Sequence, residues 1–412
     1  MTPLLFSCTP NPLGYRRYEF RYSFGMNEDF GDEVYYSDSL FFAPASEYNP
    51  TLSTVSLALA MAGFSSNEEA AGSYGNRFQN AVKLLNGLGF EDTEPNDDYR
   101  KKPETDTFGA VFAHKELEGK TLLAITVRGG GYLGEWASNF TLGKASDNPY
   151  AQGFQEASDI YLSSLRKYVE SHSLTGKTVI WAAGYSRGAA VTNLSIGRID
   201  AEIFSGVNTL LPSLSLSKED IHAYCFEPPA GAYFTAEDED DYAFKKDPFD
   251  NIHCIINLND PVPLVAPKEF SFCRYGQEHY LSDYLTNLDH ASYIKRVISF
   301  FDDLDNSDEI GDYLLSSFHK KSFFTHGLLG NDTSKRNWTS GLYLNDFIHR
   351  LAIALESRDN YVDTVQQSVR DIFRVVYSSP TVKESLFSIG IAIANKILVL
   401  DSENILVSDL LH

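Results

Sequence analysis

A serine between two glycines is the part of this sequence that most clearly could do chemistry. Residues 184–188 read Gly-Tyr-Ser-Arg-Gly; the mostly apolar run 178–183 precedes them, and a segment rich in small residues follows. The order strand, sharp turn and helix is that of a nucleophile elbow, where the positions two before and two after the serine must be very small. The five-residue pattern also fits an ordinary turn, but the order of the elements favours Ser186 as a nucleophile.

A serine nucleophile needs a base to take its proton and an acid to orient that base, and α/β-hydrolases place them in the chain order serine, acid, histidine. Asp260 follows a strand-like run, at the kind of edge where open α/β sheets carry their sites, although Asp-Pro is also a common turn. His290 has the right order and an expected loop position before a helix. His279, His319 and His326 remain alternatives, and each histidine could instead be a packed or surface residue.

An oxyanion hole requires two backbone N–H donors near the serine. The residue after the nucleophile, Arg187, supplies one, and the glycine run 129–131 after a strand-like segment supplies a candidate for the other at Gly130. That run also fits a flexible hairpin tip. It does not match the spaced glycines of a dinucleotide-binding loop. The charged side chain of Arg187 is expected either to meet an anionic group of a substrate or, more simply, to pair with an acidic residue.

The elements that must position these residues alternate between strands and helices, which predicts an α/β fold with a mostly parallel sheet and helices on both faces. Strands are expected near a sheet edge at 15–42, followed by helices at 49–66 and 76–90 and a polar loop at 91–106. A hairpin at 107–130 is expected to turn at Glu118-Gly119 and to be followed by a long amphipathic helix at 150–172. Strands are then expected at 220–231 and 251–265, on either side of an acidic loop.

Two regions are predicted. Residues 1–295 form the α/β core, divided into N-terminal strands and helices at 1–104 and the catalytic part at 105–295. Residues 296–412 read as helical throughout and are predicted to form a helical cap or an appended helical layer.

Five ordered segments between about residues 105 and 295 resemble the class 3 lipase family of α/β-hydrolases. They are VRGGGYLGEW, similar to the family's strand-Arg-Gly loop; YAQGFQEASDIYLSSL, similar to its Gly-Phe segment and helix; GYSRGAA, the elbow; YCFEPPAG; and NDPVPLVAP, similar to its acid loop. The resemblance implies Ser186 as nucleophile, Asp260 as acid, His290 as base, and Gly130 with Arg187 as oxyanion-hole donors.

The chain departs from the family pattern in three places. Tyr185 and Arg187 stand where the family usually has His and Leu around the serine, and Gly130 stands where it usually has a hydroxyl residue. The helical region after residue 300 is not part of the common family core.

The composition narrows the range of partners. A formal charge of −22 argues against binding nucleic acid or docking on anionic membranes through basic patches. The sequence contains no apolar run of 18 or more residues, so no transmembrane helix is predicted. The four cysteines follow no metal-ligand spacing, and Cys225 and Cys254 lie in runs where buried free thiols are common. A soluble protein is expected, either cytoplasmic or secreted with its signal absent from this chain.

These observations predict a serine hydrolase that cleaves carboxylic esters, of a lipid or another acyl group, through a Ser-Asp-His triad and an acyl-enzyme. No metal or organic cofactor is expected. A serine peptidase or an acyltransferase with the same triad is an alternative. A non-catalytic binding protein on a hydrolase scaffold is another, because fold does not imply function. The acyl chain, the oligomeric state and any lid movement are left open by the sequence.

Overall fold

The computed structural model describes the N-terminal strands and most of the α/β core, namely residues 14–22, 30–64, 77–100, 107–129, 138–139, 141–143, 150–233, 248–256, 262–264, 266 and 270–280. The predicted helical region 296–412 and the domain boundary at residue 295 lie outside these residues, so both stay predictions.

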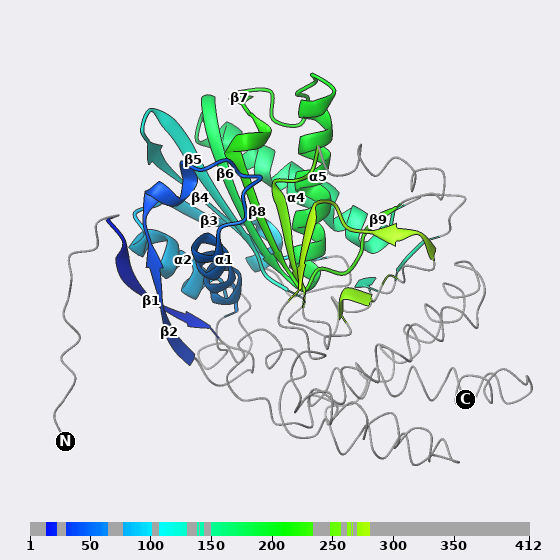
Figure 1. The fold of residues 1–412 in the computed structure, drawn as a ribbon, viewed down its shortest axis with the longest axis horizontal. Helices are drawn as coiled ribbons and strands as arrows, with labels where there is room; N and C mark the ends of the chain where they lie inside the picture. The colour runs from blue at the N-terminus through cyan, green and yellow to red at the C-terminus, as the bar shows by residue number, and fades with distance from the viewer. Residues whose placement is uncertain are drawn as a thin grey trace, which may run out of the picture.

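A mixed sheet forms the centre of the described structure (Figure 1). Its strand order is β12-β10-β8-β6-β5-β4-β3, and the short β7 pairs with β6. All neighbours from β5 to β12 are parallel, whereas β3, β4 and β5 are antiparallel. The bounds are β3 Glu91–Pro95, β4 Ala110–Leu117, β5 Lys120–Val127, β6 Gly176–Tyr185, β7 Leu214–Ser215, β8 Ile221–Phe226, β10 Ile252–Ile256 and β12 Gln277–Tyr280.

Helices cover both faces of the sheet (Figure 1). On one face, α1 (Pro50–Ala62) and α2 (Gln79–Gly87) pack with alternate residues of β6 such as Trp181 and Ala183. On the other face, the intervening residues Ile180 and Ala182 pack with α4 (Gln152–Ser171) and α5 (Arg187–Phe204). Burial on both faces explains why β6 from Thr178 onward and the whole of β8 are buried and mostly apolar. The predicted α/β fold with a mostly parallel sheet and helices on both faces is therefore confirmed.

Local signals in the sequence account for several of these elements. Helix α1 begins where the side chain of Asn49 accepts hydrogen bonds from the N–H groups of Thr51 and Leu52, and Pro50 occupies its first turn. The predicted hairpin joins β4 to β5 at Glu118 and Gly119, with φ values of 47° and 77°. Two positive φ values in a two-residue turn match the right-handed twist of paired strands.

One expectation about the N-terminal part is borne out and another was wrong. The aromatic-rich stretches are strands at a sheet edge as expected: β1 (Arg16–Tyr22) and β2 (Phe30–Tyr36) pair with each other in a separate two-stranded sheet outside the main sheet. Part of the expected polar loop 91–106 is strand β3, followed by a 3-10 turn at Asp97–Arg100. Strand β3 lies at the edge of the main sheet and buries little side-chain surface, so its residues can be polar.

Short elements complete the described structure: 3-10 turns at Asp38–Phe41, Lys218–Asp220 and Val262–Leu264, and a second small sheet of β9 (Ala232–Tyr233) and β11 (Phe272–Cys273). Cys225 and Cys254 are free thiols and are buried, as expected. Burial raises the pKa of the Cys225 thiol well above its ordinary value.

Candidate active site

Ser186 lies at the sharp turn between strand β6 and helix α5. Strand β6 ends at Tyr185, α5 begins at Arg187, and the serine between them has φ 55° and ψ −125°. A non-glycine residue is seldom held at such angles, because its Cβ is crowded there. Strain of this kind persists where the surroundings impose it, and it is found most often at functional sites.

The two glycines of the motif are required by contacts with backbone atoms. A Cβ on Gly184 would lie 2.5 Å from the carbonyl oxygen of Gly188. A Cβ on Gly188 would lie 2.5 Å from the carbonyl oxygens of Val127 and Arg128, at the end of β5. Real Cβ contacts are not this short, so the backbone would have to move. The small residues flanking Ser186 are therefore explained by the close approach of β5, β6 and α5.

The backbone of Ser186 is held on both sides. Its N–H donates to the carbonyl oxygen of Phe226, the last residue of β8, at 2.8 Å. Its carbonyl oxygen accepts from the N–H groups of Ala189 and Ala190 in the first turn of α5. The side chain makes no capping hydrogen bond to the helix, so its hydroxyl is not used to start α5. Ser186, which is 4% exposed, thus lies at the carboxyl end of the parallel strands.

Arg187, beside the nucleophile, points its side chain into the protein. The residue is 1% exposed, and its guanidinium donates a hydrogen bond to the Asn139 side-chain oxygen at 3.0 Å. The same group lies 5.9 Å from the centre of the Phe154 ring, over its face. The charge is therefore placed against an amide and an aromatic ring inside the fold. Its backbone N–H belongs to the first residue of the helix, a position without an intrahelical acceptor.

The predicted oxyanion-hole segment starts next to the elbow. Gly129 follows β5, and a Cβ at this position would lie 2.8 Å from the carbonyl oxygen of Tyr185. Only a glycine allows the chain after β5 to pass so close to the residue before the nucleophile. Gly130 itself lies outside the described residues, and its role as a donor stays a prediction.

Asp260 and His290 also lie outside the described residues, as do the alternatives His319 and His326. Strand β10, which precedes Asp260 in the chain, is described. Ile255 of β10 is level with Phe226 of β8, which is level with Tyr185 of β6. Strand β10 therefore ends at the same edge of the sheet as the strand that carries Ser186.

His279, a lesser alternative for the base, is packed against the protein on β12. One nitrogen of His253 faces the carbonyl oxygen of Ala45 at 3.0 Å, and the other faces His279 Nε2 at 3.0 Å. A carbonyl only accepts, so His253 donates to Ala45 and accepts from the N–H of His279. The ring of His279 also stacks on Tyr48 at 4.2 Å. These contacts favour the packed interpretation of His279.

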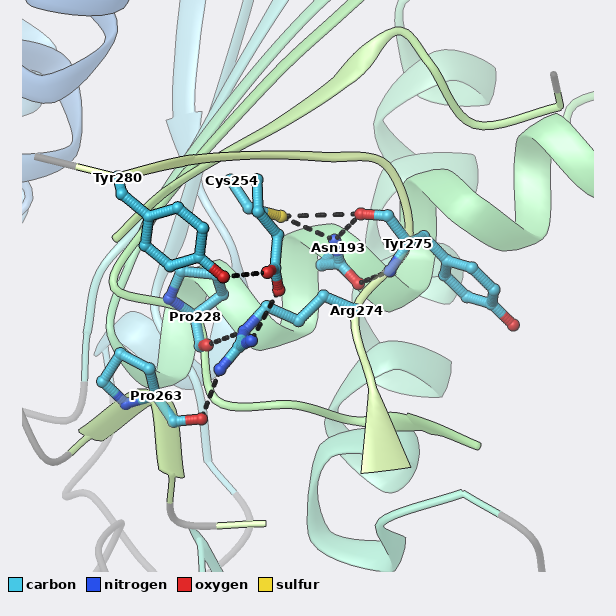
Figure 2. Close-up of polar contacts among 8 residues, drawn as sticks. Asn193, Pro228, Cys254, Pro263, Arg274, Tyr275 and Tyr280 are labelled. Carbon is cyan, nitrogen blue, oxygen red and sulfur yellow. Dashed lines mark hydrogen bonds and ion pairs between the residues drawn. The ribbon is translucent and has the colours of Figure 1, made fainter. Parts of the chain in front are cut away.

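Arg274 was missed by the sequence analysis, because no local motif surrounds it. Figure 2 shows its guanidinium between two loops that follow strands of the sheet. It donates to the carbonyl oxygen of Pro228, in the loop after β8, at 2.6 Å, and to that of Pro263, in the loop after β10. An ion pair with Glu278 at 2.7 Å orients it. Arg274 thus ties the expected acid loop to the loop beside the elbow.

The segment that carries Arg274 is itself fixed to helix α5 (Figure 2). The side-chain amide of Asn193 donates to the carbonyl oxygen of Tyr275 at 2.8 Å and accepts from the Tyr275 N–H at 3.0 Å. This two-way contact imitates the pairing of two strands. It connects the acid-loop side of the sheet to the helix that begins at the nucleophile.

A pocket of about 390 Å³ lies at the opposite end of the sheet from Ser186. It is lined by the β4–β5 turn, by Val179 in the first half of β6, and by residues 41–44. Open α/β sheets bind substrates at the carboxyl ends of their strands, and this pocket is at the amino end of β6. We therefore do not connect it with the nucleophile.

A group of side chains that could hold a metal ion lies away from the elbow, at the β3 edge of the sheet. It consists of Asp92, His114 and His172. The group is separate from the nucleophile, and no residue of the motif at 184–188 belongs to it.

Comparison with known proteins finds similar solved structures, several of them lipases. A fungal lipase bound to an inhibitor aligns with 57% of this chain and 80% of its own, at 15% identity and a TM-score of 0.36. A triacylglycerol lipase with a serine protease triad aligns over 58% and 83%, at 16% identity and a TM-score of 0.36. Lipase II from Rhizopus niveus aligns over 49% and 71%, at 12% identity and a TM-score of 0.31.

Neither a protein-family model nor a curated protein sequence matches the chain. The assignment of a hydrolase-like α/β fold rests on the parallel sheet, its two helical layers and the turn at Ser186. Within the described residues, no helix is both long enough and apolar enough to cross a membrane.

Proposed function

We propose that this chain is a serine hydrolase that cleaves carboxylic esters, with Ser186 as its nucleophile. The observation that carries the proposal is the conformation of Ser186, at φ 55° between two glycines whose Cβ positions are closed by backbone oxygens. An ordinary turn needs no such crowding. A sharp turn that places a serine at the carboxyl end of a parallel sheet is the arrangement that acyl transfer uses.

The proposed reaction proceeds in two steps. His290 accepts the proton of the Ser186 hydroxyl as the oxygen attacks the ester carbonyl, and Asp260 orients the histidine and stabilises its positive charge. The backbone N–H groups of Arg187 and Gly130 donate to the oxyanion of the tetrahedral intermediate. The alcohol leaves with the proton from His290. Water, activated by the same histidine, then hydrolyses the acyl-enzyme and regenerates the serine.

The described contacts support this assignment of the acid and of the loop around it. Asp260 follows β10, which ends level with the elbow, and Arg274 ties Pro263 of the same loop to Pro228 beside β8. We infer that Arg274 is a positioning residue for the acid loop. The substrate is proposed to be a lipid ester, on the strength of the resemblance of the five sequence segments to class 3 lipases.

Labelling with a fluorophosphonate ester, followed by peptide mapping, tests the nucleophile. The wild-type chain is expected to be labelled at Ser186, and Ser186→Ala and His290→Ala are expected to abolish labelling. Ser205→Ala is the matched control, because this serine is exposed at the other end of helix α5. A folded wild-type chain that takes no label would contradict the enzyme proposal and favour a binding protein on a hydrolase scaffold.

Two further outcomes refine the proposal. Retained labelling in His290→Ala would move the base to His326. Hydrolysis of anilides as fast as of the matching p-nitrophenyl esters would favour a peptidase over an esterase, and product formation only with an added alcohol would favour an acyltransferase. Among esters, a rate that rises with acyl-chain length would support a lipid substrate.

A further inference from the structure

Three side chains from separate parts of the chain meet at the β3 edge of the sheet. Asp92 comes from β3, His114 from β4, and His172 from the residue that ends helix α4. One ring nitrogen from each histidine and one oxygen of Asp92 all lie within 4.8 Å of one another. The three residues are not grouped in the sequence, and pairing of β3 with β4 under α4 brings them together.

The separations within this group are too long for hydrogen bonds. Asp92 Oδ2 lies 3.8 Å from His114 Nε2 and 3.6 Å from His172 Nδ1. Hydrogen bonds between such atoms are usually about 2.7–3.0 Å. Ligands bound tetrahedrally to zinc at about 2.0–2.1 Å lie about 3.3 Å from each other. The two separations from Asp92 Oδ2 exceed that spacing by a few tenths of an ångström, and the two histidine nitrogens lie within 4.8 Å of each other, so side-chain rotations would bring the three atoms to the zinc spacing.

The protonation of His114 is set by a neighbouring tyrosine. The Tyr168 hydroxyl donates its proton to the backbone carbonyl of Asp92 at 2.9 Å. The same oxygen lies 2.9 Å from His114 Nδ1, so it must accept the proton of that nitrogen. In the neutral ring, Nε2 then carries a lone pair that faces the Asp92 carboxylate. Two electron-rich atoms facing each other favour a cation between them.

His172 has a similar arrangement with a second carboxylate. Its Nδ1 faces Asp92, while its buried Nε2 lies 3.5 Å from Glu94 Oε1. A histidine that binds a metal through one nitrogen usually directs its other N–H to a carboxylate or a carbonyl. Glu94 can take this role for His172, as the Tyr168 hydroxyl does for His114.

The backbone at Asp92 is shaped to bring its carboxylate to the group. Asp92 has φ 47°, and the pairing of β3 with β4 shifts register between Glu91 and Glu94. Such an irregularity re-aims a side chain at the edge of a sheet. An aspartate tolerates this conformation better than most residues.

We propose that Asp92, His114 and His172 bind a zinc ion that fastens strands β3 and β4 to the end of helix α4. Two imidazole nitrogens and one carboxylate oxygen form a donor set that suits zinc, whereas calcium and magnesium prefer oxygen ligands throughout. The ion would connect three elements at the edge of the sheet, remote from Ser186. Its role is to stabilise the fold, and the site is independent of the proposed hydrolysis.

Zinc uptake by the full chain tests the proposal. The protein is freed of metal with a chelator and titrated with Zn²⁺ in competition with a chromogenic chelator, and its thermal unfolding is followed with and without the metal. Asp92→Asn and His172→Gln are expected to bind one zinc ion fewer per chain than the wild type and to lose the metal-dependent rise in melting temperature. Asn keeps the backbone conformation of residue 92, so this variant separates ligand loss from misfolding.

Asp97→Asn is the matched control, since Asp97 is an exposed acidic residue just beyond β3 and pairs with Lys167. It is expected to bind zinc as the wild type does. Tyr168→Phe leaves the three ligands in place but removes the group that orients His114, and it is expected to weaken zinc binding by about 10- to 100-fold. Equal zinc stoichiometry in the wild type and in folded Asp92→Asn would overturn the proposal, as would no uptake by the wild type.

Discussion

The elbow at Ser186 and the metal group at Asp92 are positioned in different ways. The elbow is a run of five neighbouring residues whose conformation is imposed by backbone atoms of β5, β6 and α5. The metal group is assembled from β3, β4 and α4, and only side chains meet in it. A site enforced by the backbone tolerates almost no change in residue size. A site assembled from side chains depends instead on how a helix packs on a sheet edge.

The largest effect expected from this difference is that of Gly188→Ala. The new methyl group would meet carbonyl oxygens at 2.5 Å, so β5 or the start of α5 must move. A displacement of about 1 Å at a nucleophile costs about 100-fold in rate, and overpacking of this kind costs about 1–3 kcal/mol of stability. Fluorophosphonate labelling rates and urea unfolding measure the two effects.

Gly87→Ala is the control for this substitution, because a Cβ at the end of helix α2 meets nothing within 4 Å. It is expected to leave labelling unchanged and to alter stability by less than about 1 kcal/mol. Full labelling of Gly188→Ala would show that the elbow is not limited by its backbone contacts.

His253 and His279 form a hydrogen-bonded histidine pair, which can be compared with the two histidines of the metal group. Burial lowers the pKa of His253 to about 4, below its ordinary value of 6.5. Between these two pH values, His253 is protonated in the unfolded chain but neutral in the folded chain. Its contribution to the free energy of unfolding is therefore fully present above pH 6.5 and is lost as the pH falls toward 4. The loss from this residue is about 3 kcal/mol at most, at about 1.4 kcal/mol for each pH unit.

Urea unfolding between pH 7.5 and pH 4.5 measures this loss, and His253→Gln is expected to show a shallower dependence by about one proton between pH 6 and pH 5. An unchanged slope would mean that the ring is not kept neutral by the fold. Burial lowers the pKa of the neighbouring His279 as well, so the wild-type slope includes both rings.

The turn between β4 and β5 tests, with a smaller expected effect, whether the turn residues themselves determine its conformation. Glu118 has φ 47°, which asparagine adopts more readily than glutamate. Glu118→Asn is expected to raise the free energy of unfolding by about 0.5–1 kcal/mol. Glu116→Asn, within the strand β4, is the control and is expected to be neutral or destabilising. A loss of stability in Glu118→Asn would mean that contacts beyond the turn determine this conformation.

The smallest expected effect is the influence of each site on the other. Asp92→Asn is expected to leave the labelling rate of Ser186 within about twofold, since the two sites share no residue. Ser186→Ala is expected to bind zinc as the wild type does. A labelling rate that fell along with zinc content would show that the two regions are coupled through the hairpin of β4 and β5.

The predictable features of this protein are those encoded over short stretches. The elbow, the hairpin at Glu118 and the helix that begins at Pro50 each have their decisive residues within about five positions. Strand β3 was not predicted, because its polar residues become a strand only by pairing with β4. Arg274 and the metal group depend on contacts between residues far apart in the chain, which periodicity and short motifs do not report. The roles of Gly130, Asp260 and His290 stay predictions.

The hydrogen bond from Ser186 N–H to Phe226 has a consequence for how a negative oxygen could be held. In chymotrypsin-type proteases, the amide of the nucleophilic serine is itself one of the two donors. Here the Ser186 N–H already donates to the carbonyl oxygen of Phe226, the last residue of β8. The peptide group that pairs β6 with β8 is therefore a different one from the groups proposed to bind the oxyanion. Replacing the backbone amide of Ser186 by an ester would remove the hydrogen bond to Phe226 and weaken the contact between β6 and β8. The proposed oxyanion donors, the N–H groups of Arg187 and Gly130, would be unchanged.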